Sequence, residues 1–382
     1  MPRTLRIASL ALLLPLALPV LSCGEDEAEP VGIDINAEDP PERLSEANLF
    51  SWDGERFEYA EGVYPYELAS PLFSDYAVKH RAIYVPEGTS ATWDDNEVLE
   101  FPVGTVILKH FLFPADFREP DRDLRLIETR VLVRYEEEWK AFPYVWDADG
   151  TDAELKVAGD FQVIDFVDAG GNTQTAQYVV PQKNQCTDCH ELKVDPTDES
   201  DTFVTPIGPK ARHLNMDYDY GEGPVNQLQY LADRGVIADL PAMDGIDQSV
   251  YFDDTVDIDA VSGAELDEMA RDYLDINCAH CHNPRGVNGI SSQLFLNHDN
   301  TDEFHLGFCK KPGSAGKGTG GFVYDIVPGN AAESILVFRM VTDDVGSMMP
   351  EIGRSLIHAE GVDLVSAWID SLPPVDCDNS GG

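Results

Sequence analysis

The chain has 382 residues, of which 43% are hydrophobic, so it is long enough for two or three globular domains with cores of their own. Its charge is unusual, because 26 basic and 70 acidic residues give a formal net charge of −44. Such a surface repels phosphate backbones and anionic lipid surfaces, which excludes a nucleic-acid-binding protein. The acidity fits either a heavily solvated surface, as in a high-salt habitat, or a protein that attracts a basic redox partner.

Residues 1–23 have the pattern of a signal peptide. Two arginines precede an apolar run over residues 7–21, which is too short for a confident membrane span. The ending Val20-Leu21-Ser22-Cys23 is similar to a bacterial lipoprotein signal. We expect Cys23 to be lipidated and to anchor the exported protein to a membrane; the alternative is an ordinary cleaved leader. Residues 24–45 are acidic and contain proline, which predicts a flexible tether.

Residues 46–181 predict an antiparallel β-sandwich-like domain. From Leu126 to Tyr135 the residues alternate, with Ile127, Thr129, Val131, Val133 and Tyr135 on one face. Further strands are expected over 98–113, 139–146, 161–167 and 177–180, with Asp-Gly and Gly-Gly turns at 149–150 and 170–171.

Two segments have the C-x-x-C-H form by which a c-type haem is attached. They are Cys186-Thr187-Asp188-Cys189-His190 and Cys278-Ala279-His280-Cys281-His282. The spacing places both thiols of a motif at one haem edge for two thioether bonds. The adjoining His190 and His282 are then expected to be the fifth iron ligands. The alternatives are a zinc site or a redox dithiol, but each cysteine pair carries its own following histidine.

The two motifs predict two haem units of different completeness. No amphipathic helix precedes the first motif, so residues 182–250 predict an abbreviated unit, with one short helix over 226–234. Residues 251–377 predict a better-formed cytochrome c domain. A capping box at Ser262 starts a helix with one apolar face that leads into the second motif, and a second helix over 362–372 ends at two prolines. The expected fold class is therefore α+β multidomain: the β-sandwich-like domain followed by two α-helical cytochrome c-type units.

The sixth iron ligand is predictable for the second haem only. Met349 lies in the loop before the last helix, and a thioether suits ferrous iron; Met348 is the neighbouring alternative. For the first haem no ligand is evident. Met216, Met243, His213 and His80 are candidates, and an open sixth site is the alternative. His280, inside the second motif, is expected to point to solvent.

Cys309 and Cys377 remain after the other cysteines are assigned. An even remainder in an exported protein favours a disulfide over two free thiols.

Several segments are distinctive in combination: Pro65–Leu68, Ser70–Ala77, Phe101–Val106, Tyr144–Trp146, Pro206–Lys210, Asn277–Pro284, Ile326–Asn330 and Met349–Ser355. With the two motifs they resemble a bacterial family of exported dihaem c-type cytochromes with an N-terminal β-rich domain. The likeness covers about residues 45–372. It implies electron transfer and supports Met349 as a ligand, but implies no substrate.

These observations favour a lipid-anchored protein of the periplasm or cell surface that carries two covalently bound haem c groups. It would pass electrons from a donor, such as a dehydrogenase, to a further acceptor, and is favoured as an electron carrier over a stand-alone enzyme. A first alternative is a dihaem peroxidase-like enzyme with an open sixth site on the first haem. A second is a binding protein that uses exposed tryptophans of the β domain.

Overall fold

The computed structural model of the protein describes residues 31–37, 39–94, 98–286 and 293–379. The predicted signal peptide, the predicted lipidation site Cys23 and residues 24–30 of the predicted tether lie outside these residues. From Val31 onward the chain packs as one compact unit. No helix among the described residues is both long and apolar enough to cross a membrane.

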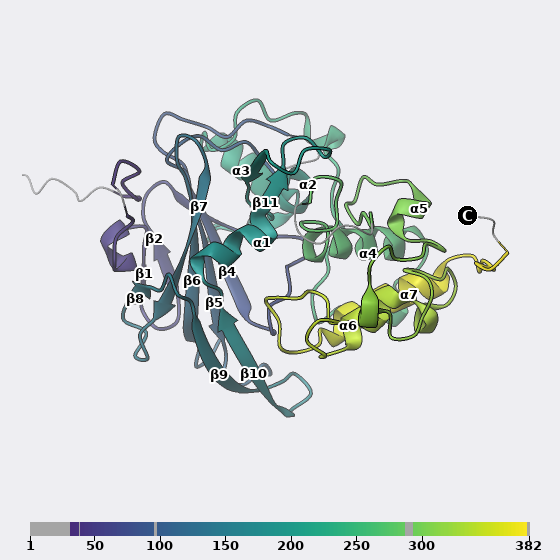
Figure 1. Ribbon diagram of the computed structural model, residues 1–382. Coiled ribbons are helices and arrows are strands. Elements are labelled where there is room, and N and C mark those ends of the chain that lie inside the picture. Colours follow the sequence, from purple (N-terminus) through teal and green to yellow (C-terminus); the bar gives the residue numbers. More distant parts are fainter. Residues whose placement is uncertain (1–30, 38, 95–97, 287–292, 380–382) are drawn as a thin grey trace, which may run out of the picture. The chain divides into compact units, whose positions relative to one another are not determined.

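A six-stranded antiparallel sheet dominates the first half of the chain (Figure 1). Its strands follow one another in sequence as β3-β4-β5-β6-β7-β8, so each neighbouring pair is joined by a local connection. Four two-stranded hairpins accompany it. The strands are β1 (Phe50–Trp52), β2 (Phe57–Tyr59), β3 (Val63–Tyr66), β4 (Val78–Tyr84), β5 (Val106–Phe113), β6 (Arg125–Arg134), β7 (Trp139–Trp146), β8 (Ala153–Leu155), β9 (Asp160–Val167), β10 (Thr173–Val180), β11 (Glu191–Lys193), β12 (Thr202–Val204), β13 (Asp217–Asp219) and β14 (Pro224–Asn226).

The two faces of this sheet are covered differently. On one face Ala82, Leu108, Val131 and Phe142 form one continuous apolar core with the N-terminal segment and the β1–β2 hairpin. On the other face two separate apolar clusters lie toward opposite ends of the strands. One contains Ile83, Ile107 and Leu132 and packs against α3 (Gln227–Asp233); the other contains Phe111, Phe113 and Val145 and packs against the β9–β10 hairpin. Between them this second face carries polar residues.

The expectation that Ile127 shares a face with Thr129 and Val131 is wrong. The pairing between β5 and β6 shifts at Phe111/Leu112, so that Phe111 pairs with Glu128 while Leu112 pairs with Leu126. The extra residue is a β-bulge, and it turns Ile127 to the face opposite Val131. The alternation in the sequence gives no sign of this inserted residue.

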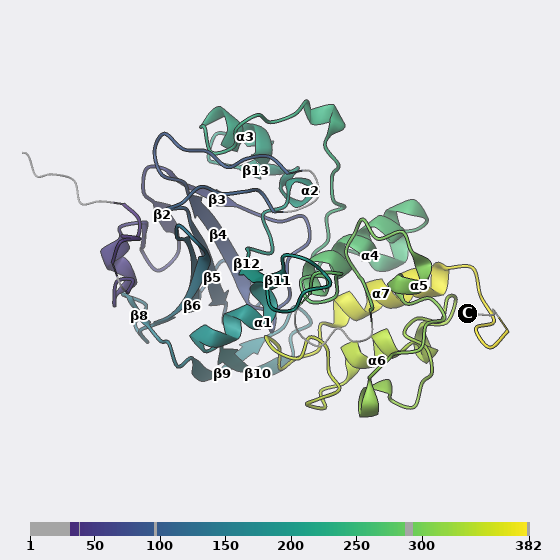
Figure 2. The same cartoon turned by 45° about the horizontal axis from the view of Figure 1, so that its top comes forward.

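The described residues contain seven α-helices, of which five have seven residues or fewer. They are α1 (Thr187–His190), α2 (Ala211–Leu214), α3 (Gln227–Asp233), α4 (Ala264–Asn277), α5 (Glu303–Leu306), α6 (Ile335–Val341) and α7 (Ala359–Ser371). Figure 2 shows α4, α6 and α7 grouped beyond α1, away from the sheet.

The predicted fold class is therefore wrong. The structure is rich in β-strands, its helices are few and short, and no two α-helical cytochrome c units are evident among the described residues. The sheet is also a single meander with hairpins rather than a sandwich of two sheets. The physical reason lies in the apolar periodicity, because only α4 and α7 have an apolar face long enough to build a helical core. The described residues of segments 182–250 and 278–334 instead form hairpins, loops and helices of at most seven residues.

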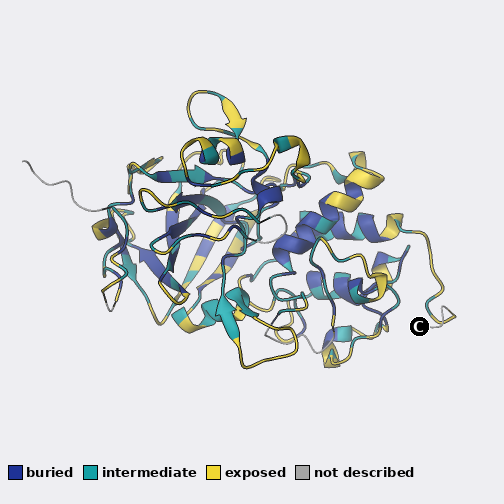
Figure 3. Cartoon of the chain, turned by 90° about the horizontal axis from the view of Figure 1, so that it is seen from above, coloured by how far each residue is buried: buried dark blue, intermediate teal, exposed yellow. Residues whose placement is uncertain are grey.

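Helices α4 and α7 pack against each other and form the core of the C-terminal region. Leu266, Met269, Tyr273 and Leu274 of α4 are buried in one cluster with Trp368 of α7, which is 1% exposed. The indole nitrogen of Trp368 donates to Asp267, 2.7 Å away. Figure 3 shows both helices as mostly buried where they meet. The predicted capping box does not form, because α4 begins after Gly263 without a side-chain cap.

The second half of the predicted tether is packed rather than free. Ile33 and Leu44 are buried in the core on the first face of the sheet, and Gly32 N donates to Ala47 O. Apolar residues spaced through an acidic segment were enough to fix it to the sheet.

Candidate functional site

The first C-x-x-C-H motif follows the β9–β10 hairpin directly. The chain leaves β10, makes a 3-10 turn (Lys183–Cys186) and then the single helical turn α1 (Thr187–His190). Gln182 and Gln185 form a reciprocal capping box at the start of this turn. The ammonium of Lys183 lies 4.6 Å from the ring centroid of Phe142 in β7. The motif is thus fixed against the sheet, although neither short helix contains a buried residue.

Cys186, Cys189 and His190 line a cavity of about 300 Å³, here called the first cavity. Its other walls are the polar middle of the sheet's second face, the 206–209 segment and the loop 348–354. Pockets of roughly 300–1,000 Å³ are typical of sites for small molecules and cofactors.

The imidazole of His190 is oriented by the backbone. Its Nδ1 lies 2.8 Å from the carbonyl oxygen of Thr205, and donation of the Nδ1 proton to this acceptor leaves the Nε2 lone pair free. Burial lowers the pKa of His190 to about 4, so the ring is neutral at physiological pH. A neutral, oriented imidazole is the form that binds a metal.

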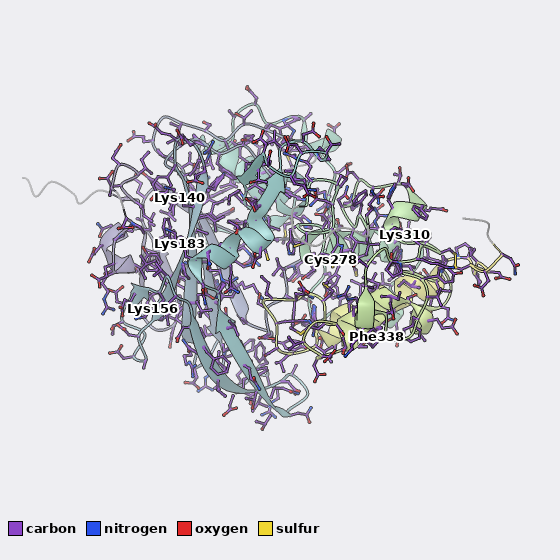
Figure 4. All side chains as sticks on the ribbon, viewed as in Figure 1. Lys140, Lys156, Lys183, Cys278, Lys310 and Phe338 are labelled. Atoms are coloured by element: carbon purple, nitrogen blue, oxygen red, sulfur yellow. A yellow bond between two sulfur atoms is a disulfide. The ribbon has the colours of Figure 1, made fainter. Side chains whose placement is uncertain are left out.

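The second motif caps helix α4. The N–H of Cys278 donates to Leu274 O, and the N–H of His282 donates to Cys278 O at 2.8 Å, which makes a tight turn of the motif. Cys278, Cys281, His282 and Met349 all line a cavity of about 470 Å³, here called the second cavity. Figure 4 labels Cys278, which lies between the sheet and the C-terminal helices.

His282 has surroundings similar to those of His190. Burial lowers its pKa to about 4, while the backbone of Leu294 weakly favours the charged form. Its Nδ1 is buried and has no hydrogen-bond partner within the described ranges. The buried thiols are shifted in the opposite direction, because burial raises the pKa of Cys278 to about 12 and of Cys186 to about 11.

The two cavities are neighbours with a common wall. Phe73, Asn277 and the loop 350–354 contribute to both, as do Cys189 and His280. Ligand atoms of Cys189, His280 and Cys281 lie within 4.8 Å of one another. A hydrogen bond from the Cys281 thiol lowers the pKa of Cys189 to about 3 and raises that of Cys281. The expectation that His280 points to solvent is wrong: it lies at this junction, and its Nδ1 is buried.

The predicted candidates for the first haem's sixth ligand lie elsewhere. His213 is fully buried beside Asp275, and Met243 packs against the cluster that contains α3. His80 lines a separate pocket with Trp52 and Phe57, and Met216 does not line the first cavity. Met348 does line it, whereas Met349 lines the second cavity. The sequence did not point to Met348 as a residue of the first cavity; its position next to Met349 was the one available signal.

The residues of each cavity fit a covalently attached haem. Each cavity is lined by the two thiols and the histidine of its own motif and by at least one methionine, and cationic residues of the sheet lie on one wall of the first cavity. Cys186, Cys189 and His190 would hold one haem; Cys278, Cys281, His282 and Met349 would hold the other. The three-membered group of Cys189, His280 and Cys281 is also compatible with a zinc ion, but it leaves Cys186 and Cys278 without a role.

Cys309 and Cys377 form a disulfide with an S–S distance of 2.03 Å, as expected from their number. It joins the segment after α5 to the chain beyond α7 and lies apart from both cavities.

None of the family models, curated proteins or solved structures compared with the chain matches it.

Proposed function

We propose that the protein is an exported electron carrier with two covalently bound haem c groups, one at each C-x-x-C-H motif. The observation that carries this proposal is that each motif lines its own cavity with its histidine neutral and largely buried, and that the two cavities share a wall. The resemblance of many segments to exported dihaem cytochromes gives the same function.

The residues around each cavity have separable tasks. Haem supplies a reversible one-electron couple at its iron. Cys186 and Cys189, or Cys278 and Cys281, fix its edge, and the Thr205 carbonyl orients His190. Met349 would be the sixth ligand on the second side, and methionine ligation raises the reduction potential. Cys189 and Cys281, one from each motif, lie side by side at the junction, which favours electron exchange between the two sites.

The exported location and the partners belong to the same proposal. A lipidated Cys23 would anchor the protein at the periplasmic or cell-surface side of a membrane. The net charge of −44 favours a basic redox partner, such as a dehydrogenase, through electrostatic attraction.

A dihaem peroxidase-like enzyme is the second candidate. It is favoured by one observation: Met216, Met243, His213 and His80 do not line the first cavity. A five-coordinate iron there would be open to peroxide, and catalysis would need a nearby acid or base. Met348 is the residue that decides between the two functions, because it is the methionine on that wall.

The test is the haem content of the purified protein, followed by its reduced optical spectrum with and without carbon monoxide. We expect two covalent haems per chain, and an unchanged spectrum if both irons are six-coordinate, each with two protein ligands. A change that amounts to one haem per chain would favour the enzyme, and peroxide turnover would then be measured. A chain that retains no covalent haem, or binds zinc at one per chain instead, would contradict the proposal.

A further inference from the structure

Three basic residues form a row across the second face of the sheet. Arg81 of β4 pairs in register with Lys109 of β5, and Lys109 pairs in register with Arg130 of β6. Tyr66 and Pro143 continue the row on the outer strands β3 and β7. All five residues line the first cavity, opposite the first C-x-x-C-H motif.

The row lies in an apolar setting where cations are costly. The neighbouring row toward α3 is Ile83, Ile107 and Leu132, and beyond the other side lies the cluster with Phe111 and Val145. Adjacent like charges on paired strands also repel one another. Three cations in this position, in a chain with 26 basic and 70 acidic residues, therefore need an anionic partner.

The carboxylates of the protein provide only part of the negative charge that the three cations need. Both oxygens of Glu128 accept from Arg130, at 2.8 and 3.0 Å, and Tyr178 also donates to it, so this pair is complete. Glu67 accepts from Arg81 Nη1 at 2.9 Å. Asp75 and Glu351 also line the cavity, but the oxygens of Asp75 accept from Ser355 and Leu356.

Two groups of the row, Arg81 Nη2 and the Lys109 ammonium, have no hydrogen-bond partner in the part of the chain that the structure describes. The side chain of Arg81 is 3% exposed, and its Nη2 is buried with no hydrogen-bond partner within the described ranges. Lys109 forms no hydrogen bond or ion pair with any described residue; its ammonium lies 5.1 Å from the ring centroid of Phe111. Burial, and then the charge of Arg81, lower the pKa of Lys109 well below its usual value. A bound anion would reverse this by compensating the charge.

We propose that Arg81, Lys109 and Arg130 form an anion site on the wall of the first cavity, and that its ligand is a carboxylate. On the proposed function, this carboxylate is a propionate of the first haem. The other source with the same chemistry is a small carboxylic acid that binds beside the haem. Guanidinium groups bind carboxylates through directed hydrogen bonds, and the unpaired Arg81 Nη2 and Lys109 ammonium would donate them.

The test compares single variants of the haem-loaded protein by redox titration. Lys109→Gln and Arg81→Gln each remove one positive charge from the row, and Lys109→Arg keeps it. A nearby cation favours the reduced iron, so we expect each Gln variant to lower one of the two midpoint potentials and to leave the other in place. The control Lys140→Gln removes a charge from β7 of the same sheet at an exposed position, labelled in Figure 4, and should move neither.

Calorimetry with succinate separates the two sources. If the potentials of Lys109→Gln match the wild type but succinate binds the wild type at least tenfold more tightly than this variant, the ligand is a free carboxylic acid. If the potentials are unchanged and succinate does not bind, the anion site is overturned. If the wild type holds no haem, the proposed function fails, but succinate binding to that protein and to Lys109→Gln still decides whether the anion site exists.

Discussion

The two C-x-x-C-H segments have the same chemistry but different supports. The first lies on a 3-10 turn and a single helical turn that bury no side chain of their own, and the sheet provides its cavity. The second ends α4, a helix of 14 residues whose apolar face is buried against α7. The first site therefore depends on long-range contacts with β-strands, whereas the second depends on the local packing of two helices.

The two cavities also differ in the charged groups that line them. The first cavity has the cationic row on one wall, whereas the second cavity is bounded mainly by the C-terminal helices and loops. On the proposed function, the same covalent group would thus experience different fields at the two sites, which would give the two haems unequal potentials. The predictions below test how far the two sites are independent.

The largest effect is expected from removing the thiols of one motif. Cys186→Ala with Cys189→Ala, and separately Cys278→Ala with Cys281→Ala, should each reduce the covalent haem content from two per chain to one. Because Cys278 and Ala279 pack against the helical core, the second pair should also lower the unfolding temperature more than the first. Haem staining of denatured protein and thermal unfolding measure both. Two haems in either variant would contradict the assignment.

Replacing the methionine that lines one cavity should affect one site only. Met349→Leu preserves volume and removes the thioether, so we expect a lower midpoint potential for one haem and carbon monoxide binding at one per chain. Met348→Leu is the matched variant for the first cavity. An unchanged spectrum in Met349→Leu would show that Met349 is not a ligand, and a change in Met348→Leu would identify the first haem's sixth ligand.

The third prediction concerns the ionic contact that joins α2 to α4. Asp275 accepts from Lys210 at 2.9 Å, and Arg212 contacts both Asp275 and Asp272, all of them largely buried. Asp275→Asn leaves these cations without their partner and should cost about 3–5 kcal/mol in the free energy of unfolding. The exposed Asp363→Asn is the control and should change it by less than about 0.5 kcal/mol. Urea unfolding measures both.

The pH dependence of this contact has a definite sign. Burial alone would raise the pKa of Asp275, but Lys210, His213 and Arg212 together lower it well below its usual value. A lowered folded-state pKa gives stability that is present above the unfolded pKa of about 4 and is lost as the pH falls below it. The variant Asp275→Asn should not lose stability in this way as the pH falls. Parallel acid unfolding curves of the wild type and the variant would contradict this prediction.

The smallest effects are expected at two glycines that each support one site. A Cβ at Gly159, which has φ +71°, would lie 2.4 Å from Val180 O, just before the first motif. A Cβ at Gly361 would meet the Tyr273 hydroxyl of α4 at 2.2 Å, beside the second cavity. We expect Gly159→Ala and Gly361→Ala to cost about 1–3 kcal/mol each, and to shift the first and second haem potentials respectively. Gly245→Ala meets no atom within 4 Å and is the control.

The sequence predicted the two long helices and the strands β6, β7 and β9 well, but it missed β3 and β4, and β5 begins only at Val106 of the expected 98–113. Trp139–Trp146 was expected as a strand and is one, because aromatic and β-branched residues favour strands. The bulge at Ile127 was missed because it depends on the pairing with β5. The helical units were wrong because a haem motif was taken to imply the helices that often carry it.

The motif residues themselves could be predicted, because attachment chemistry fixes their spacing. The cationic row could not, since it requires the register of three strands: Arg81, Lys109 and Arg130 are far apart in the chain. A partial signal was present, because Lys109 and His110 interrupt an apolar run in β5. The role of Met348 could not be predicted either, because it depends on which of the two cavities each methionine of the loop 348–354 faces.

The junction of Cys189 and Cys281 has a consequence for the biosynthesis of the protein. A hydrogen bond from the Cys281 thiol lowers the pKa of Cys189, and two neighbouring sulfurs of which one ionises readily are well placed to be oxidised to a disulfide, which would remove one sulfur from each motif. Cys309 and Cys377, in contrast, must be oxidised to form theirs. On the proposed function, maturation of this chain therefore needs opposite treatment of two thiol pairs: Cys189 and Cys281 must stay reduced until haem is attached, while Cys309 and Cys377 must be oxidised to a disulfide.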